Sequence, residues 1–140
     1  MNQTLAIIKP DAMKKDNMNN IKEDIIDNGF SILKEKTLLL TDKQACSFYD
    51  IHKEKPFFNE LTTFMSSGQT MVLALEKENA VSAWRATIGA TNPEEAEDGT
   101  IRKKFATSLS ENAVHGADSD ENAEIEISFF FTDSELISNQ

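Results

Sequence analysis

Residues 4–11 read Thr-Leu-Ala-Ile-Ile-Lys-Pro-Asp. The uninterrupted apolar run Leu5–Ile8 is typical of a short buried β-strand. The run ends at Lys9-Pro10, and proline has no amide proton to donate to a central hydrogen-bond ladder. The segment therefore predicts a buried strand followed by a turn.

Helical and extended patterns alternate downstream of this strand. We expect helices at 18–28 and 80–88, where apolar residues recur at helical spacing, and helices at 42–52 and 57–65 from their end signals. We expect strands at 30–40, 70–75 and 112–115. Thr41 and Gln44 form a capping box ahead of the second helix, and Thr100 can cap a short basic helix. Residues 90–99 form a polar stretch long enough to be a functional loop.

The C-terminal segment is ambiguous in its periodicity. Glu124–Phe129 alternates strictly, as in a strand, whereas Ala123, Ile127 and Phe130 follow helical spacing. Asp118, with Glu121 three residues later, supplies a helix cap, so we predict a helix.

Strands interleaved with helices predict an α+β fold, an α/β sandwich. Four strands in this order suit a ferredoxin-like core, in which helices cover a four-stranded antiparallel sheet. A length of 140 residues predicts one domain over residues 1–140.

The charge of the chain is strongly acidic and unevenly distributed. The formal net charge is -10, and all 14 Lys and Arg lie at or before Lys104, while 8 of the 24 Asp and Glu follow it. Electrostatic binding to membranes or non-specific binding to nucleic acid is therefore disfavoured. No apolar run is long enough to cross a bilayer. The single cysteine, Cys46, excludes an intrachain disulfide, and the absence of a signal-peptide core predicts a cytoplasmic protein.

The sequence contains no glycine-rich phosphate loop and no Cys or His pair at metal-ligand spacing. Phosphate chemistry would therefore depend on side chains and an isolated nucleophile. His52, at a predicted helix end, is most simply a solvated residue. His115 is the better candidate, because the end of a strand can hold an imidazole facing a cleft, although a structural histidine is the commoner case.

Four other side chains have a functional and an ordinary interpretation. Glu126 could accept a hydrogen bond from one ring nitrogen of His115 and leave the other as a nucleophile, or it could be a solvated carboxylate. Lys9 could contact a phosphate or a sugar, or it could be a charge at the end of a strand. Arg85 and Arg102 could bind phosphate oxygens, or they could be surface charges.

Five segments together resemble the nucleoside diphosphate kinase family. They are Thr4–Asp11, Lys55–Phe58, Gly89–Pro93, Gly99–Arg102 and above all Asn112-Ala-Val-His-Gly-Ala-Asp-Ser119, in order across most of the chain. The resemblance implies ping-pong transfer of the terminal phosphate, mainly from ATP, to nucleoside diphosphates of any base through phosphohistidine on His115. It also implies Mg²⁺ as cofactor and a homo-oligomer, with a hexamer favoured over a tetramer.

The resemblance also assigns roles to individual residues. Glu126 would orient His115, and Tyr49 would line the phosphate end beside Lys9. The implied nucleotide-binding residues are Lys9, Phe57, Leu61, Arg85, Thr91, Arg102, Leu109, Asn112 and Gly116. Asp118 would contact Mg²⁺ through water, with the ion held mainly by phosphates.

Two positions depart from the family pattern. Ala117 stands where the family usually has serine, which removes a hydroxyl expected near Glu126, and Gln69 stands where it often has proline. Ala117 supports an alternative interpretation as a non-catalytic nucleotide-binding module. The acidic C-terminal third supports another, a subunit that docks a basic partner.

Overall fold

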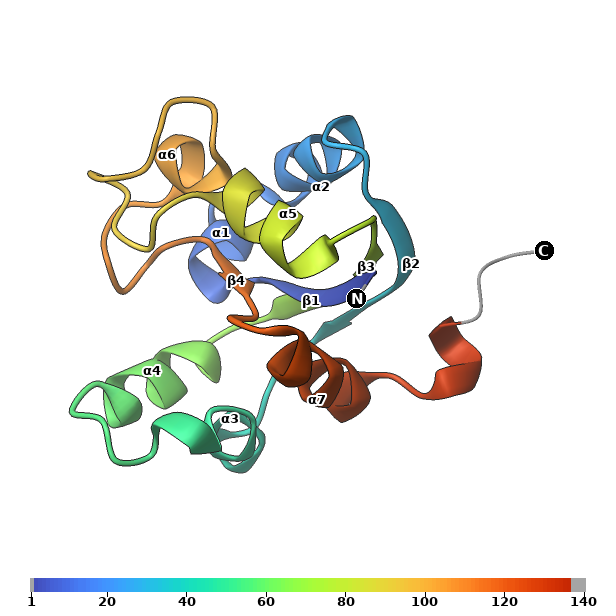
Figure 1. Cartoon of the computed structure of the whole chain (residues 1–140). Helices are drawn as coiled ribbons and strands as arrows, with labels where there is room; N and C mark the ends of the chain where they lie inside the picture. Colours follow the sequence, from blue (N-terminus) through green and yellow to red (C-terminus); the bar gives the residue numbers. More distant parts are fainter. Residues whose placement is uncertain (1, 137–140) are drawn as a thin grey trace.

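Four strands form one antiparallel sheet in the order β2-β3-β1-β4 (Figure 1). The strands are β1 (Gln3–Ile8), β2 (Ser31–Leu38), β3 (Thr70–Glu76) and β4 (Val114–Gly116). The structure, a computed structural model, describes residues 2–136. β1 lies between β3 and β4, and Leu5–Ile8 are fully buried, so the predicted buried strand is confirmed.

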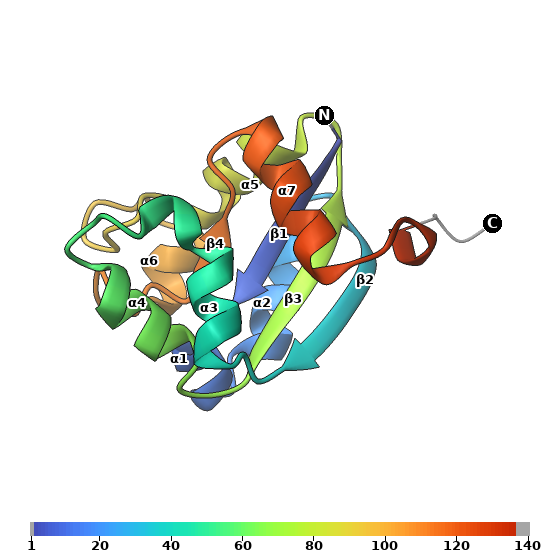
Figure 2. The same cartoon turned by 90° about the horizontal axis from the view of Figure 1, so that it is seen from below.

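Helices cover both faces of the sheet. They are α1 (Pro10–Lys14), α2 (Met18–Asp27), α3 (Asp42–Phe48), α4 (Phe58–Met65), α5 (Ala80–Ile88), α6 (Ile101–Phe105) and α7 (Asp120–Phe130), with 3₁₀ turns at Asp50–His52 and Asp133–Leu136. α2 and α5 lie on one face, and α3, α4 and α7 on the other (Figures 1 and 2). The predicted ferredoxin-like α+β sandwich is confirmed. Across residues 2–136 the helices are all too short or too polar to span a bilayer.

The two covered faces explain the uninterrupted apolar sequence of β1. Ala6 and Ile8 pack into the core beneath α2 and α5, whereas Leu5 and Ile7 pack into the core beneath α3, α4 and α7. Every residue from Leu5 to Ile8 is fully buried. A strand that is buried on both faces does not alternate between apolar and polar residues.

Several element ends differ from the prediction. Pro10 starts a short helix instead of a simple turn, because proline fits the first helical position. α3 ends at Phe48, before the 3₁₀ turn, and Phe57 is the N-cap of α4. β2 ends at Leu38, and Leu39 beyond it is mostly exposed.

The last strand and the last helix are also displaced. β4 was predicted at 112–115 but begins at Val114, because Ala113 has a left-handed backbone with φ of 72°. β4 extends one residue beyond the prediction, to Gly116, which pairs with Ala6. The predicted helix α7 is confirmed, but its cap is Ser119, whose hydroxyl accepts from the amide of Asn122 at 3.1 Å, and not Asp118.

Candidate active site

Strand register places the side chain of His115 on the same face of the sheet as α7. His115 pairs with Ile7, which belongs to the core under α3, α4 and α7. Nε2 of His115 lies 2.6 Å from Oε1 of Glu126 on α7, and both side chains are mostly buried. A carboxylate at this distance fixes the ring orientation and leaves Nδ1 as the nitrogen it does not engage.

Three aromatic residues from other elements hold His115 in place. The indole Nε1 of Trp84 donates to the backbone carbonyl of His115 at 2.9 Å. The rings of Phe48 and Tyr49 meet the imidazole edge-on, with centroids 5.5 and 6.1 Å away. Burial, with the charge of Glu126, raises the pKa of Tyr49 above its usual value, so its hydroxyl stays protonated.

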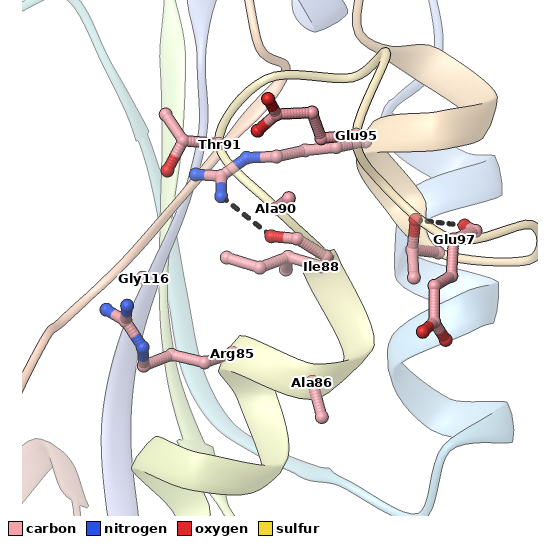
Figure 3. Close-up of a pocket in the computed structure, with 11 residues that line it drawn as sticks. Arg85, Ala86, Ile88, Ala90, Thr91, Glu95, Glu97 and Gly116 are labelled. Atoms are coloured by element: carbon pink, nitrogen blue, oxygen red, sulfur yellow. Dashed lines mark hydrogen bonds between the residues drawn. The ribbon is translucent and has the colours of Figure 1, made fainter.

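A cavity of about 530 Å³ adjoins β4 between α5 and α6. Its lining includes Arg85, Thr91, Arg102, Gly116, Glu95 and Glu97. Figure 3 shows the Arg85 side chain extending toward Gly116, with Thr91 on the opposite side of the cavity. The Arg85 side chain is exposed, and its only hydrogen bond within residues 2–136 is a long one of 3.4 Å to the carbonyl of Ala117.

Three cations from distant parts of the chain converge near this cavity. Burial and then the charge of Arg102 lower the pKa of Lys9 to about 8, and burial and then the charge of Arg85 lower the pKa of Arg102 to about 10. None of the three forms an ion pair within residues 2–136. Neighbouring cations that have no carboxylate in ion-pair contact favour binding of an anion.

Arg102 also has a structural role, which the sequence interpretation as a surface charge missed. It is buried, and its two terminal nitrogens donate to the carbonyls of Gly89 at 3.0 Å and Val114 at 2.9 Å. Nε of Arg102 has no partner within residues 2–136. Arg102 therefore ties the polar loop to β4.

A second cavity, of about 310 Å³, is mostly apolar and shares Thr91 with the first cavity. Its lining includes Lys9, Phe57, Leu61, Thr91, Leu109 and Asn112, all of which were predicted to bind nucleotide. Nζ of Lys9 donates to Oδ1 of Asn112 at 2.9 Å, although 103 positions separate them. Phe57 and Leu109 are 47% and 60% exposed, so an apolar ligand would cover them.

Four of the predicted site residues line neither cavity: His115, Glu126, Tyr49 and Asp118. His115 is next to Gly116, which lines the larger cavity. Asp118 is exposed, and Nδ2 of Asn122 donates to its carboxylate at 2.6 Å. That bond and the charge of Arg85 lower the pKa of Asp118.

Trp84 and Phe48 are the neighbours of His115 that sequence reasoning missed. Both looked like ordinary core residues of helices. A buried indole needs an acceptor for its N–H, which was a usable signal for Trp84. Phe48 contacts His115 because α3 packs on the same face of the sheet. The position of Phe48 in the sequence does not indicate this contact. His52 is 5.6 Å from Phe57, ring centroid to ring centroid.

The fold and the site together define a class of protein. A histidine oriented by a carboxylate stands beside a cationic cavity, and an apolar cavity with a Lys-Asn pair opens next to it. Phosphates suit the first cavity and a nucleoside suits the second. These features fit a nucleotide-dependent phosphotransferase.

Comparison with known proteins gives the family. A family model described as nucleoside diphosphate kinase matches residues 2–136. Nucleoside diphosphate kinases of Geotalea uraniireducens and Geobacter sulfurreducens are 53% and 50% identical over 137 residues, covering 98% of this chain and 100% of each relative. The chain belongs to the nucleoside diphosphate kinase family, and its activity is nucleoside diphosphate kinase activity.

Solved structures agree with this assignment. The Aquifex aeolicus nucleoside diphosphate kinase has a TM-score of 0.95 at 42% identity, covering 97% of this chain and 99% of its own. A halophilic nucleoside diphosphate kinase from Halobacterium salinarum, solved in complex with CDP, has a TM-score of 0.93 at 29% identity. The match covers 100% of this chain and 94% of that protein's chain.

Proposed function

We propose that His115 carries the phosphate between two nucleotides in a ping-pong exchange. Nδ1 of His115 attacks the terminal phosphorus of a nucleoside triphosphate, mainly ATP, and the bond to the bridging oxygen breaks, so the diphosphate leaves with that electron pair. A second diphosphate then reverses these steps. The observation that supports this most is the 2.6 Å contact between Nε2 and Glu126, which leaves Nδ1 to react.

The cationic cavity is proposed to stabilise the transferring phosphate. Phosphoryl transfer passes through a loose transition state that needs positioning and charge stabilisation. The exposed guanidinium of Arg85, the free Nε of Arg102 and the ammonium of Lys9 supply charge, and the hydroxyl of Thr91 supplies a hydrogen bond. The hydroxyl of Tyr49, which has no hydrogen-bond partner within residues 2–136, donates at the phosphate end.

The apolar cavity is proposed to take the nucleoside. Phe57 stacks on the base, and Leu61 and Leu109 contact it from the other sides, while Lys9 and Asn112 bind the ribose hydroxyls. Base–aromatic stacking is worth about 1–3 kcal/mol and is similar for every base. Recognition by stacking therefore supports broad base specificity and a role in maintaining nucleotide pools.

The exposed carboxylate of Asp118 fits a Mg²⁺ ion that is held mainly by the nucleotide phosphates. No group of three or more His, Cys, Asp or Glu within residues 2–136 could hold a metal, and Mg²⁺ in such sites needs only one or two carboxylates beside phosphates and waters. We propose that Asp118 contacts the ion through water. The ion would neutralise charge on the phosphates.

The family resemblance also supports a homo-oligomer, hexameric in preference to tetrameric, that works in the cytoplasm. Its partners are nucleoside triphosphates and diphosphates. The net charge of -10 supports an absence of specific nucleic-acid and membrane partners.

Terminally labelled ATP tests the exchange directly. The wild type is expected to acquire a label that is acid-labile and base-stable, and GDP, CDP or UDP should each discharge it. His115→Ala should take up no label. His52→Ala is the matched histidine control and should label normally.

The same experiment separates the alternatives. A wild type that binds ADP but takes no label would be the non-catalytic module. A label that no diphosphate discharges would indicate a phosphocarrier. Thermal stabilisation by ADP with Mg²⁺ would argue against a purely protein-docking subunit.

A further inference from the structure

The turn that begins β4 holds a residue in an uncommon conformation. Ala113 has φ of 72°, a left-handed value that non-glycine residues seldom adopt. The amide of Val114 donates to the carbonyl of Asn112 at 2.8 Å, which closes a three-residue γ-turn around Ala113. A γ-turn with positive φ at its centre is rare and strained. His115 comes two residues after Ala113 and directly follows the turn.

Both backbone polar groups of Ala113 are held by the segment Lys9–Asp11. The amide of Lys9 donates to the carbonyl of Ala113 at 2.8 Å. The amide of Ala113 donates to Oδ2 of Asp11 at 3.1 Å. Asp11 is 4% exposed and Ala113 is fully buried, so water cannot replace these bonds.

We propose that Asp11 is a positioning residue for His115: its carboxylate fixes the strained turn at Ala113, and the turn fixes the start of β4. The proposal rests on the proposed role of His115 as the phosphate carrier. Without the Asp11 acceptor, the buried amide of Ala113 loses its partner, and the turn relaxes toward negative φ. The imidazole then leaves the position in which Nε2 faces Glu126.

Asp11 has a second possible role, as a counter-charge. The charge of Asp11 acts on Lys9, although burial dominates the pKa of Lys9. The two roles differ in what they need. Positioning needs only an oxygen acceptor at Oδ2, because Oδ1 has no partner within residues 2–136. A counter-charge needs the ionised group.

Two variants of Asp11 separate these roles. Asp11→Asn keeps an oxygen acceptor and removes the charge, and it should keep at least a third of the wild-type rate of His115 phosphorylation by ATP with Mg²⁺ in a single turnover. Asp11→Ala removes the acceptor and should lower that rate at least tenfold. A tenfold loss in Asp11→Asn, or a wild-type rate in Asp11→Ala, overturns the proposal. If Asp11→Ala does not fold, Asp11→Asn alone decides.

Relief of backbone strain gives an independent test. Glycine adopts positive φ without strain, so Ala113→Gly in the Asp11→Ala background should restore the rate at least threefold. Asn79 also has positive φ, at 53°, and lies exposed at the start of α5 without a capping bond. Asn79→Gly in the same background is the matched control and should restore nothing. Equal recovery in both would indicate a general gain in stability and would overturn the proposal.

A readout without catalysis keeps this proposal distinguishable from the proposed function. The imidazole nitrogens of His115 can be followed by ¹⁵N NMR in the nucleotide-free protein. The wild type and Asp11→Asn should show one tautomer with Nε2 bonded to Glu126, and Asp11→Ala should show a mixture. Failure of the wild type to form phosphohistidine would refute the transfer mechanism while this spectrum still tested the position of the ring.

Discussion

Trp84 and His115 are joined by a hydrogen bond of 2.9 Å from the indole Nε1 to the backbone carbonyl. α5 thereby holds the strand residue whose side chain faces α7 on the opposite side of the sheet. The close approach depends on Gly116, since a Cβ there would lie 3.0 Å from carbons of both Trp84 and Ile88. The indole therefore needs two consecutive residues of β4: His115 provides the carbonyl acceptor, and Gly116 leaves room for the ring.

Gly116→Ala is therefore expected to destabilise the fold and slow phosphoryl transfer. The added methyl group overpacks the contact with α5, which costs about 1–3 kcal/mol of unfolding free energy. Urea unfolding and the rate of His115 labelling measure the two effects. Gly68→Ala is the control, because a Cβ there would meet Pro10 at an ordinary 3.6 Å. Equal stability of the two variants would contradict this account of Gly116.

The sheet and its helical layers were predictable because local patterns determine them. The apolar run of β1 and the capping box at Thr41, which the structure contains, are properties of adjacent residues. The start of β4 was not predictable, because the positive φ of Ala113 depends on hydrogen bonds to residues about 100 positions earlier. No short window of sequence contains that information.

The candidate site divides in the same way. The residues alone left Glu126 open between a partner of His115 and a solvated carboxylate. The family resemblance assigned the pair that the structure brings to 2.6 Å. The buried donor role of Arg102 was missed, because the acceptors at Gly89 and Val114 come together only in the folded chain. Long-range packing, and not residue type, decides such roles.

Glu126→Gln should slow phosphorylation of His115 roughly 10- to 100-fold. Hydrogen bonds to charged groups are worth about 1.5–3 kcal/mol, and each 1.36 kcal/mol on the barrier is about tenfold in rate. Single-turnover labelling with ATP measures the rate, and ADP affinity should hardly change because Glu126 lines neither cavity. Glu124→Gln removes the same charge at an exposed position of α7 and should be silent. Comparable losses in the two variants would mean that net charge, and not orientation, is responsible.

Binding of ADP should be accompanied by proton uptake above pH 8. The pKa of Lys9 is about 8 in the nucleotide-free protein, and anionic phosphates nearby raise it, because they favour the charged form. Affinity for ADP should therefore fall by up to about tenfold per pH unit from pH 8 upward, until the pKa of the complex is reached. Calorimetry in two buffers of different ionisation enthalpy measures the uptake. Lys9→Met should abolish it, and unchanged uptake in that variant would assign the proton to another group.

Ala117→Ser should speed phosphorylation of His115 about fivefold. Serine is the usual family residue here, and a hydroxyl that reaches Glu126 adds a hydrogen bond worth about 1 kcal/mol. Ala117 is almost completely buried in a small apolar cluster with Val81 and Ala123. An unpaired hydroxyl in that cluster would lower the unfolding free energy by about 1–3 kcal/mol. Single-turnover labelling and urea unfolding, measured together, therefore distinguish the outcomes: a faster rate with stability retained confirms the bond to Glu126, and a loss of stability without a faster rate refutes it.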